Sequence, residues 1–269
     1  MAKETLLDLI RQAVNDLMEN GFTWDRMRDW QHRIEMALQT YGDTSAAERR
    51  IAKGLTDLFA RKTSPAALEK VHPGVDRVTL RMIAEQHRGL LDERIMASID
   101  LIRLNRERMV AKTLDRFSGW ATSIPTGGSA LKASESVSHI VKPLRSLSYE
   151  ERRLHIDQGH KMIAAVNEVL GIQSGAIVMI WRSHYRQAGY DYREDHKERD
   201  GKVYAIRGNW AMEQGFMKLA GHEYTDQITA PAEEVNCRCF GIYLRNLRDL
   251  PAEMLTKKGK EELTRVKVS

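Results

Sequence analysis

Residues 176–181 read Ala-Ile-Val-Met-Ile-Trp, and this stretch decides the class of fold. It is short, apolar and rich in β-branched residues, which is typical of a buried strand. Residues 202–206 and residues 239–244 have the same character. Together the three segments predict a short antiparallel sheet in the C-terminal half of the chain.

The sequence before this stretch has the periodicity of helices. In the first segment apolar residues recur at intervals of three and four: Leu6, Leu7, Ile10, Ala13, Val14 and Leu17. A similar stripe continues from 78 to 120 without a proline, which predicts one helix of roughly 40 residues or two nearly continuous ones. We therefore expect residues 1–122 to form a helical region with a long helix near 78–120.

The remaining boundaries follow from changes in composition. Residues 123–147 contain Pro125, Gly127, Gly128 and several serines, which predicts a loop or hinge. Residues 148–250 would form a small α+β module, and residues 251–269 a C-terminal tail or short surface helix. The expected fold is thus α+β and mostly α, with a long helical N-terminal region before the module.

Composition excludes several classes of protein. The 269 residues include 42 Lys and Arg against 37 Asp and Glu, which gives a net charge of +5. Basic and acidic residues are interspersed along the chain. Interspersed charges are typical of solvated helix faces. Two cysteines are too few for the disulfide framework of a small secreted protein. Neither a signal peptide nor an apolar run of membrane-spanning length is evident. We expect an intracellular, soluble protein with no membrane segment.

Motifs of common catalytic sites are missing from the sequence. It has no glycine-rich dinucleotide or P-loop pattern, no nucleophile elbow and no HExxH zinc-protease pattern. This lowers the expectation of an enzyme.

The informative residues lie near the C-terminus. Cys237 and Cys239 stand two positions apart, so on a strand both side chains would point to the same face. With His196 they would supply three ligands for a zinc ion, and His184, His222 or Asp200 are candidates for a fourth. The alternative is that the two cysteines are small buried hydrophobes and that His196 only hydrogen-bonds its neighbours. Metal binding is therefore a hypothesis at this point.

The order of residues around this cluster resembles a known family. The pattern comprises Trp181, Asp191, Arg193, His196, Asp200, Gly201, Asn236 and Arg238, with the two cysteines on either side of Arg238. In this order they resemble the C-terminal domain of phage head morphogenesis proteins, the Mu F-like minor capsid proteins of tailed double-stranded DNA phages. The resemblance covers about residues 150–245, and Asn-Cys-Arg-Cys at 236–239 is its most specific part.

The resemblance implies a structural role and not an enzymatic one. Members of the family are minor head proteins that assist head assembly and DNA packaging or delivery at the portal vertex. It implies the portal protein as partner, with the major capsid protein or scaffold as further candidates and packaged DNA nearby, bound without sequence specificity. It also implies location in the virion head after assembly in the host cytoplasm.

Two other functions remain open from the residues. One is a metal-dependent hydrolase or nuclease that uses the His and Cys cluster, with a water on an open metal position. The other is an internal, DNA-associated protein that is ejected with the genome. Arginines along residues 78–120 favour the second, but acidic residues interrupt them.

Overall fold

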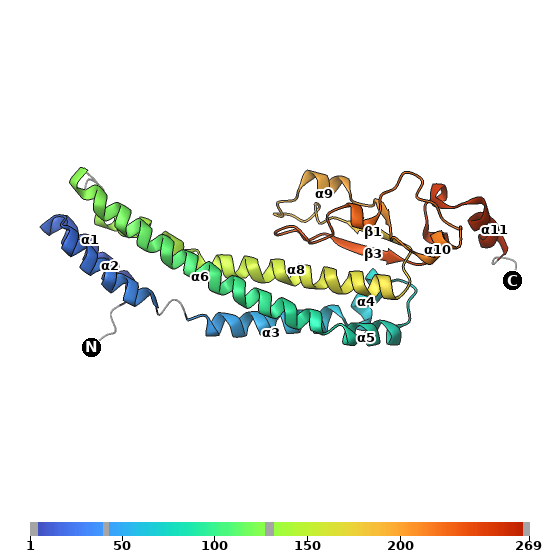
Figure 1. Cartoon of the computed structure of the whole chain (residues 1–269), viewed down its shortest axis with the longest axis horizontal. Coiled ribbons are helices and arrows are strands. Elements are labelled where there is room, and N and C mark those ends of the chain that lie inside the picture. Colours follow the sequence, from blue (N-terminus) through green and yellow to red (C-terminus); the bar gives the residue numbers. More distant parts are fainter. Residues whose placement is uncertain (1–4, 40–42, 127–131, 266–269) are drawn as a thin grey trace. The chain divides into compact units, whose positions relative to one another are not determined.

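The computed structural model describes residues 5–39, 43–126 and 132–265. The chain forms two compact units, one of Met1–Ala52 and Met96–Leu154 and the other of Lys53–Ile95 and His155–Ser269. Each unit thus combines two separate stretches of sequence. The boundaries between the units fall within three helices, α3 (Ser45–Lys62), α6 (Gly89–Ser123) and α8 (Leu147–Gln173). All three are labelled in Figure 1. These boundaries differ from the expected division at residues 122 and 148, because long-range packing groups the helices.

The N-terminal unit is a helical assembly around one apolar core. It contains α1 (Leu6–Asn20), α2 (Trp24–Gln39) and α7 (Ala133–Arg145), together with the C-terminal part of α6. Thr5 caps α1 by accepting a hydrogen bond from the backbone N–H of Asp8, which satisfies one free donor at the helix start. The largest side chains with no exposed surface in this core are Ile10, Leu17, Ile34, Leu38, Phe117 and Ile140.

Helix α7 corrects the loop that we expected over residues 123–147. After a short 3-10 turn at Ile124–Thr126, residues 133–145 are helical. Its serines suggested a loop, but Val137, Ile140 and Val141 between them are buried against the core that contains α1. Tertiary packing of this apolar stripe outweighs the weak helix propensity of serine. The expected turn at Gly127 and Gly128 lies outside the described residues.

The long stripe over residues 78–120 forms two helices in succession. Helix α5 (Arg77–Gln86) ends at His87, and the 35-residue helix α6 begins at Gly89. Asp76 fixes the start of α5 because its carboxylate accepts hydrogen bonds from the backbone N–H groups of Val78 and Thr79. The structure thus has the second of the two expected arrangements.

The second unit contains the predicted sheet. Its strands are β1 (Val178–Arg182), β2 (Val203–Ala205) and β3 (Phe240–Leu244), in the order β2-β1-β3 with both pairs antiparallel. Val178 on the central strand is opposite both Ala205 and Leu244. The prediction of a mostly helical α+β fold with a short antiparallel sheet is confirmed.

Both faces of the central strand are covered. Alternate residues of β1 point to opposite faces, so Val178 joins one core and Met179 and Trp181 join another. The first core includes Leu244, Met217 and Met254. The second core includes Tyr204, Tyr243 and both cysteines. The cysteines therefore lie on the same side of the sheet as Trp181.

The segment after residue 250 contains the short helix that was one of the two expected arrangements, and it packs against the module. A 3-10 turn at Ala252–Met254 buries Met254 completely. Helix α11 (Lys257–Arg265) follows, and its Gly259 lies so close to the Phe216 carbonyl that a Cβ atom would be 2.2 Å from that oxygen. The residues 266–269 lie outside the described part of the chain.

The second unit also contains helices that pack against α8. Helix α4 (Pro65–Val71), α5 and the C-terminal part of α8 share a core of Leu68, Leu80, Val166 and Leu170. The short helices α9 (Glu194–Glu198) and α10 (Trp210–Glu213) lie between the strands in sequence. Among the described residues, no helix combines the length and apolar character needed to cross a membrane.

Candidate metal centre

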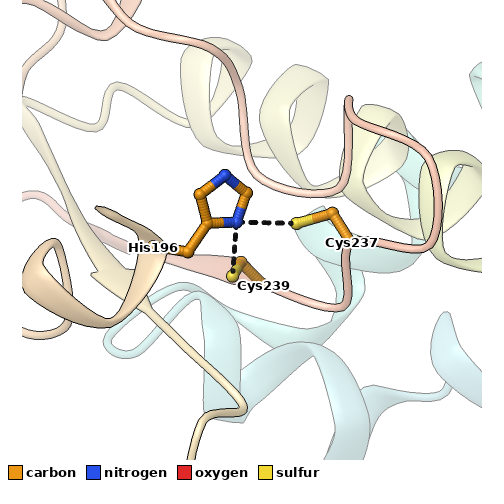
Figure 2. Close-up of side chains that lie close together, drawn as sticks. All are labelled: His196, Cys237 and Cys239. Carbon is orange, nitrogen blue, oxygen red and sulfur yellow. Dashed lines mark hydrogen bonds between the residues drawn. The ribbon is translucent and has the colours of Figure 1, made fainter. Parts of the chain in front are cut away.

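Three residues that the sequence singled out as zinc ligands lie together. His196 is on α9, and Cys237 and Cys239 are in the segment that leads into β3. The Nδ1 atom of His196 is 3.4 Å from the Cys237 Sγ atom and 3.5 Å from the Cys239 Sγ atom. Figure 2 shows this single ring nitrogen facing both sulfurs. At most 3% of any of the three residues is exposed.

The spacing of these atoms suits tetrahedral coordination. A zinc ion lies about 2.0–2.1 Å from a histidine nitrogen and about 2.3 Å from a thiolate sulfur. At a tetrahedral angle, those bond lengths place nitrogen and sulfur about 3.6 Å apart. The two observed separations are within about 0.2 Å of that value. An S–H···N hydrogen bond has a similar length, so the cluster is compact with or without an ion.

The backbone before the cysteines is held in an unusual conformation. Asn236 has a φ of 61°, in the left-handed region that asparagine tolerates better than most residues. Its N–H donates to the Asp157 carboxylate at 2.5 Å, and its carbonyl accepts from the Tyr190 hydroxyl at 3.2 Å. The same hydroxyl accepts from the N–H of Arg238 at 3.1 Å. Asp157 and Tyr190 thus fix the turn that brings the two sulfurs together.

Two carboxylates lie behind the imidazole. The Oε2 atom of Glu234 is 3.7 Å and the Oδ2 atom of Asp195 is 3.8 Å from the Nε2 atom of His196. Glu234 is also 2.7 Å from the Nε atom of Arg193. Arg193 also donates to the Val235 carbonyl at 3.0 Å. A carboxylate on the far nitrogen of a metal-binding histidine typically fixes its tautomer and orientation. Arg193 therefore positions Glu234, and Glu234 is placed to orient His196.

The tryptophan of the pattern closes the other side of the histidine. The edge of the Trp181 ring meets His196 with the ring centres 5.4 Å apart, and the guanidinium of Arg199 lies 5.1 Å from the centre of the Trp181 ring. Trp181 has no exposed surface. The aromatic wall and the cation exclude water from the imidazole on this side.

Asp200 and Gly201 form the turn that returns the chain from α9 to β2. The Asp200 carboxylate accepts from the N–H of Ser183 at 2.9 Å, and the N–H of Gly201 donates to the Trp181 carbonyl at 2.9 Å. Gly201 has a φ of 83°, a conformation that a residue with a side chain rarely adopts. Both residues have structural roles in the turn, and Asp200 is occupied there.

The two thiols have different acidities. A hydrogen bond from Cys239, with further help from backbone N–H groups, lowers the pKa of the Cys237 thiol to about 6. The same pairing with Cys237, together with burial, raises the pKa of Cys239. Without an ion, the pair is therefore expected to share one negative charge near neutral pH.

Within the described part of the chain, two buried nitrogen atoms around the cluster have no hydrogen-bond partner. They are the Nε1 atom of Trp181 and the Nε2 atom of His196, which is the ring nitrogen that does not face the sulfurs. Unpartnered buried polar atoms are uncommon, and a bound water or ion is one usual reason for them. Their presence beside three potential ligand atoms fits a site that holds a further group.

Some residues of the pattern lie outside the cluster. Asp191 is exposed, and its side chain has no partner among the residues that the structure describes. Arg238 points away from the sulfurs, and its guanidinium lies 5.0 Å from the centre of the Tyr190 ring. The contact of Arg238 is therefore aromatic stacking on Tyr190, and not an ion pair with Asp191.

Among the described residues, the group of potential ligands consists of His196, Cys237 and Cys239, and no fourth ligand joins them. Of the candidates, Asp200 is held in its turn, and His222 is bonded through Nδ1 to the Val203 carbonyl. His184 instead packs its ring against Phe240. A zinc ion here would take its fourth ligand from solvent or from another molecule.

Sequence reasoning missed three residues that build the site. Glu234 stands three positions before Cys237, and this proximity is the one signal that could have identified it. Tyr190 and Asp157 act through single contacts with the backbone of residues 236–238. Asp157 is 79 positions from Asn236, and periodicity gives no sign of such a contact.

Comparisons with known proteins do not assign a family or a function to this site. No family model matches the chain, and neither the curated proteins nor the solved structures contain a significant match.

Proposed function

We propose that this chain is a structural minor head protein of a tailed double-stranded DNA phage. The portal protein would be its main partner, with the major capsid protein or scaffold as further contacts and packaged DNA nearby. It would be located in the virion head after assembly in the host cytoplasm. In this proposal, zinc on His196, Cys237 and Cys239 stabilises the C-terminal module.

One observation supports this proposal above the others. Trp181, His196 and the two cysteines are separated by up to 58 positions, yet their side chains form one buried cluster. Arg193, Asp200, Gly201 and Asn236 hold the segments around it. A pattern whose members stabilise a common centre is what a domain-defining motif requires.

Burial favours a structural role over catalysis. A catalytic zinc keeps a coordination position open to water and substrate, and the position that three protein ligands leave here is the one that a substrate would have to reach. Here the three candidate ligands are almost entirely buried, and Trp181 covers the imidazole. A hydrolase would need a path for its substrate to this point. A zinc-stabilised fold needs none, because the binding energy of the ion contributes directly to folding.

Metal analysis of the purified protein tests the zinc centre. We expect about one zinc ion per chain in protein expressed with zinc, measured by plasma mass spectrometry. The double variant Cys237→Ser/Cys239→Ser and the single variant His196→Ala should lose the ion. The variant His32→Ala changes an exposed histidine of the other unit and should retain it. Wild-type protein free of metal, or zinc retained by the double variant, would contradict the centre.

Co-assembly tests the function. We expect the chain to bind portal protein from the genome that encodes it and to sediment with assembled heads in co-expression. Exclusion of wild-type protein from both would refute the head role. Phosphodiester cleavage that disappears in His196→Ala would favour the hydrolase, and chain release together with DNA from particles would favour the ejected DNA-associated protein.

A further inference from the structure

The second unit contains a cavity with an unusual charge. It has a volume of about 610 Å³ and lies between residues of α3, α4, α8 and the segments around β1 and β3. Four cationic side chains line it, those of Arg61, Lys62, Lys70 and Arg238, and no Asp or Glu does so in the described part of the chain. This is the size range in which proteins bind small molecules.

The four cations are not neutralised within the protein. Among the described residues, none of them forms an ion pair with a carboxylate. Elsewhere in this unit cations do so, as Arg193 does with Glu234 and Arg207 with Asp226. Arg238 is half-buried, and the other three are exposed around it. Like charges grouped without counter-charges are an unfavourable arrangement unless an anion joins them.

A histidine inside the cavity reports the same positive potential. His160 on α8 lines the cavity, and its pKa is lowered to about 4. Burial is the main cause. The charges of Arg238, His184 and Lys62 lower the pKa further, and the carboxylate of Asp157 opposes them. Arg238 and Lys62 must therefore lie near enough to oppose a further positive charge.

The rest of the lining is apolar. Leu58, Ile156, Ile163 and Phe240 contribute hydrocarbon surface. Phe240 packs against His184 with ring centres 5.6 Å apart, so the cavity also has an aromatic edge. Helices α3 and α8 approach closely at its floor, since a Cβ atom on Gly54 would be 2.2 Å from the His155 ring. An apolar and aromatic floor beside cations suits a flat ring that bears phosphate groups.

We propose that this cavity binds a phosphate-bearing ligand of nucleotide size. The phosphates contact Arg238 and the lysines, and the base lies against the apolar lining near Phe240. Arginine and lysine are the usual partners of phosphate groups. The limited volume favours a single nucleotide over an extended nucleic acid. The cavity has neither of the glycine-rich loops of common nucleotide sites, so the recognition rests on side chains.

Calorimetric titration of the whole zinc-loaded chain tests the proposal with three probes. These are ATP, inorganic triphosphate and a short DNA duplex of random sequence. We expect ATP and triphosphate to bind, with ATP tighter because of its base. The double variant Lys62→Ala/Lys70→Ala should weaken ATP binding at least tenfold, and both lysines are exposed, so the fold should persist.

A matched variant controls for net charge. Lys202→Ala/Lys218→Ala removes two exposed lysines of the same unit outside the cavity lining and should bind ATP as the wild type does. A shift of the His160 ring signal in NMR spectra on addition of ATP should locate the ligand. Equal weakening in both double variants would overturn the proposal.

Two further outcomes would overturn the nucleotide site. One is the absence of ATP and triphosphate binding at millimolar concentration. The other is binding of the duplex alone, which would assign the cations to a surface for nucleic-acid phosphates. Zinc content is measured independently on the same preparations, so a failed metal centre and a failed cavity are distinguishable.

Discussion

Replacing Gly171 with alanine should destabilise the second unit, although alanine is the better helix former. A Cβ atom at this position would lie 2.3, 2.6 and 2.8 Å from the Cδ1, Cγ and Cε1 atoms of Tyr243. Tyr243 is 5% exposed and its ring stacks on His72 with ring centres 5.4 Å apart, so a shift of the ring towards the cavity of about 410 Å³ that it also lines would break this stack. The substitution therefore forces an extra carbon against a packed ring.

The expected magnitude follows from two opposing contributions. Overpacking costs about 1–3 kcal/mol, and the severity of this contact places it near the upper end. Alanine in place of glycine within a helix returns about 1 kcal/mol. The free energy of unfolding should therefore fall by about 2 kcal/mol, which lowers Tm by about 4–8 °C in a chain of this size. Tyr243 shares a core with both cysteines, so zinc binding should weaken as well.

Gly119 supplies the matched control. It lies within α6, and a Cβ atom there would meet nothing within 4 Å. The same substitution should therefore raise the free energy of unfolding by about 0.5–1 kcal/mol. Urea unfolding followed by circular dichroism measures both variants. A Gly171→Ala protein as stable as the wild type would refute the packing argument, and a destabilised Gly119→Ala protein would refute the comparison.

Two further perturbations test the site and its surroundings. Glu234→Gln should weaken zinc affinity about tenfold, at the lower end for a residue behind a ligand, because its carboxylate is 3.7 Å from the His196 Nε2 atom. Competition with a chelator measures the zinc affinity, and Glu223→Gln, at an exposed position, is the control. Equal zinc affinity of Glu234→Gln and the wild type would show that Glu234 does not support the centre. Burial, followed by the charge of Arg245, lowers the pKa of His72 from 6.5 to about 4. As the pH falls, His72 of the unfolded chain takes up a proton below about pH 6.5, and His72 of the folded chain does so only near pH 4. The free energy of unfolding should therefore fall by about 3 kcal/mol between pH 6.5 and pH 4. Unfolding of wild type and His72→Gln at several pH values checks this, and identical pH dependence would contradict it.

Local patterns predicted the strands well because the sheet is short and strongly apolar. Residues 202–206 and 239–244 contain β2 and β3, and residues 176–181 contain β1 except for its last residue, Arg182. Between α4 and α5 the chain contains Pro73 and Gly74, which are typical helix breakers. Helix α7 was missed because its serines resemble a loop, and its burial depends on α1, more than 100 positions earlier.

The candidate site shows the same limit. The sequence identified His196, Cys237 and Cys239, since these residue types have few other reasons to gather. It did not identify Asp157 or Tyr190, which act only once the chain has folded. The cavity was beyond reach for the same reason, because its cations come from residues 61–70 and from Arg238.

The backbone at Asn236 restricts which residues can replace it in related chains. Its φ of 61° allows asparagine, glycine and aspartate and disfavours β-branched residues such as valine or threonine. The contacts with Asp157 and Tyr190 use only its N–H and carbonyl groups, so they place no demand on the side chain. Evolution is therefore free to exchange this residue within that small set. Distant homologues should be recognised by the spacing of the two cysteines and the histidine, and a glycine before the first cysteine should count as a match.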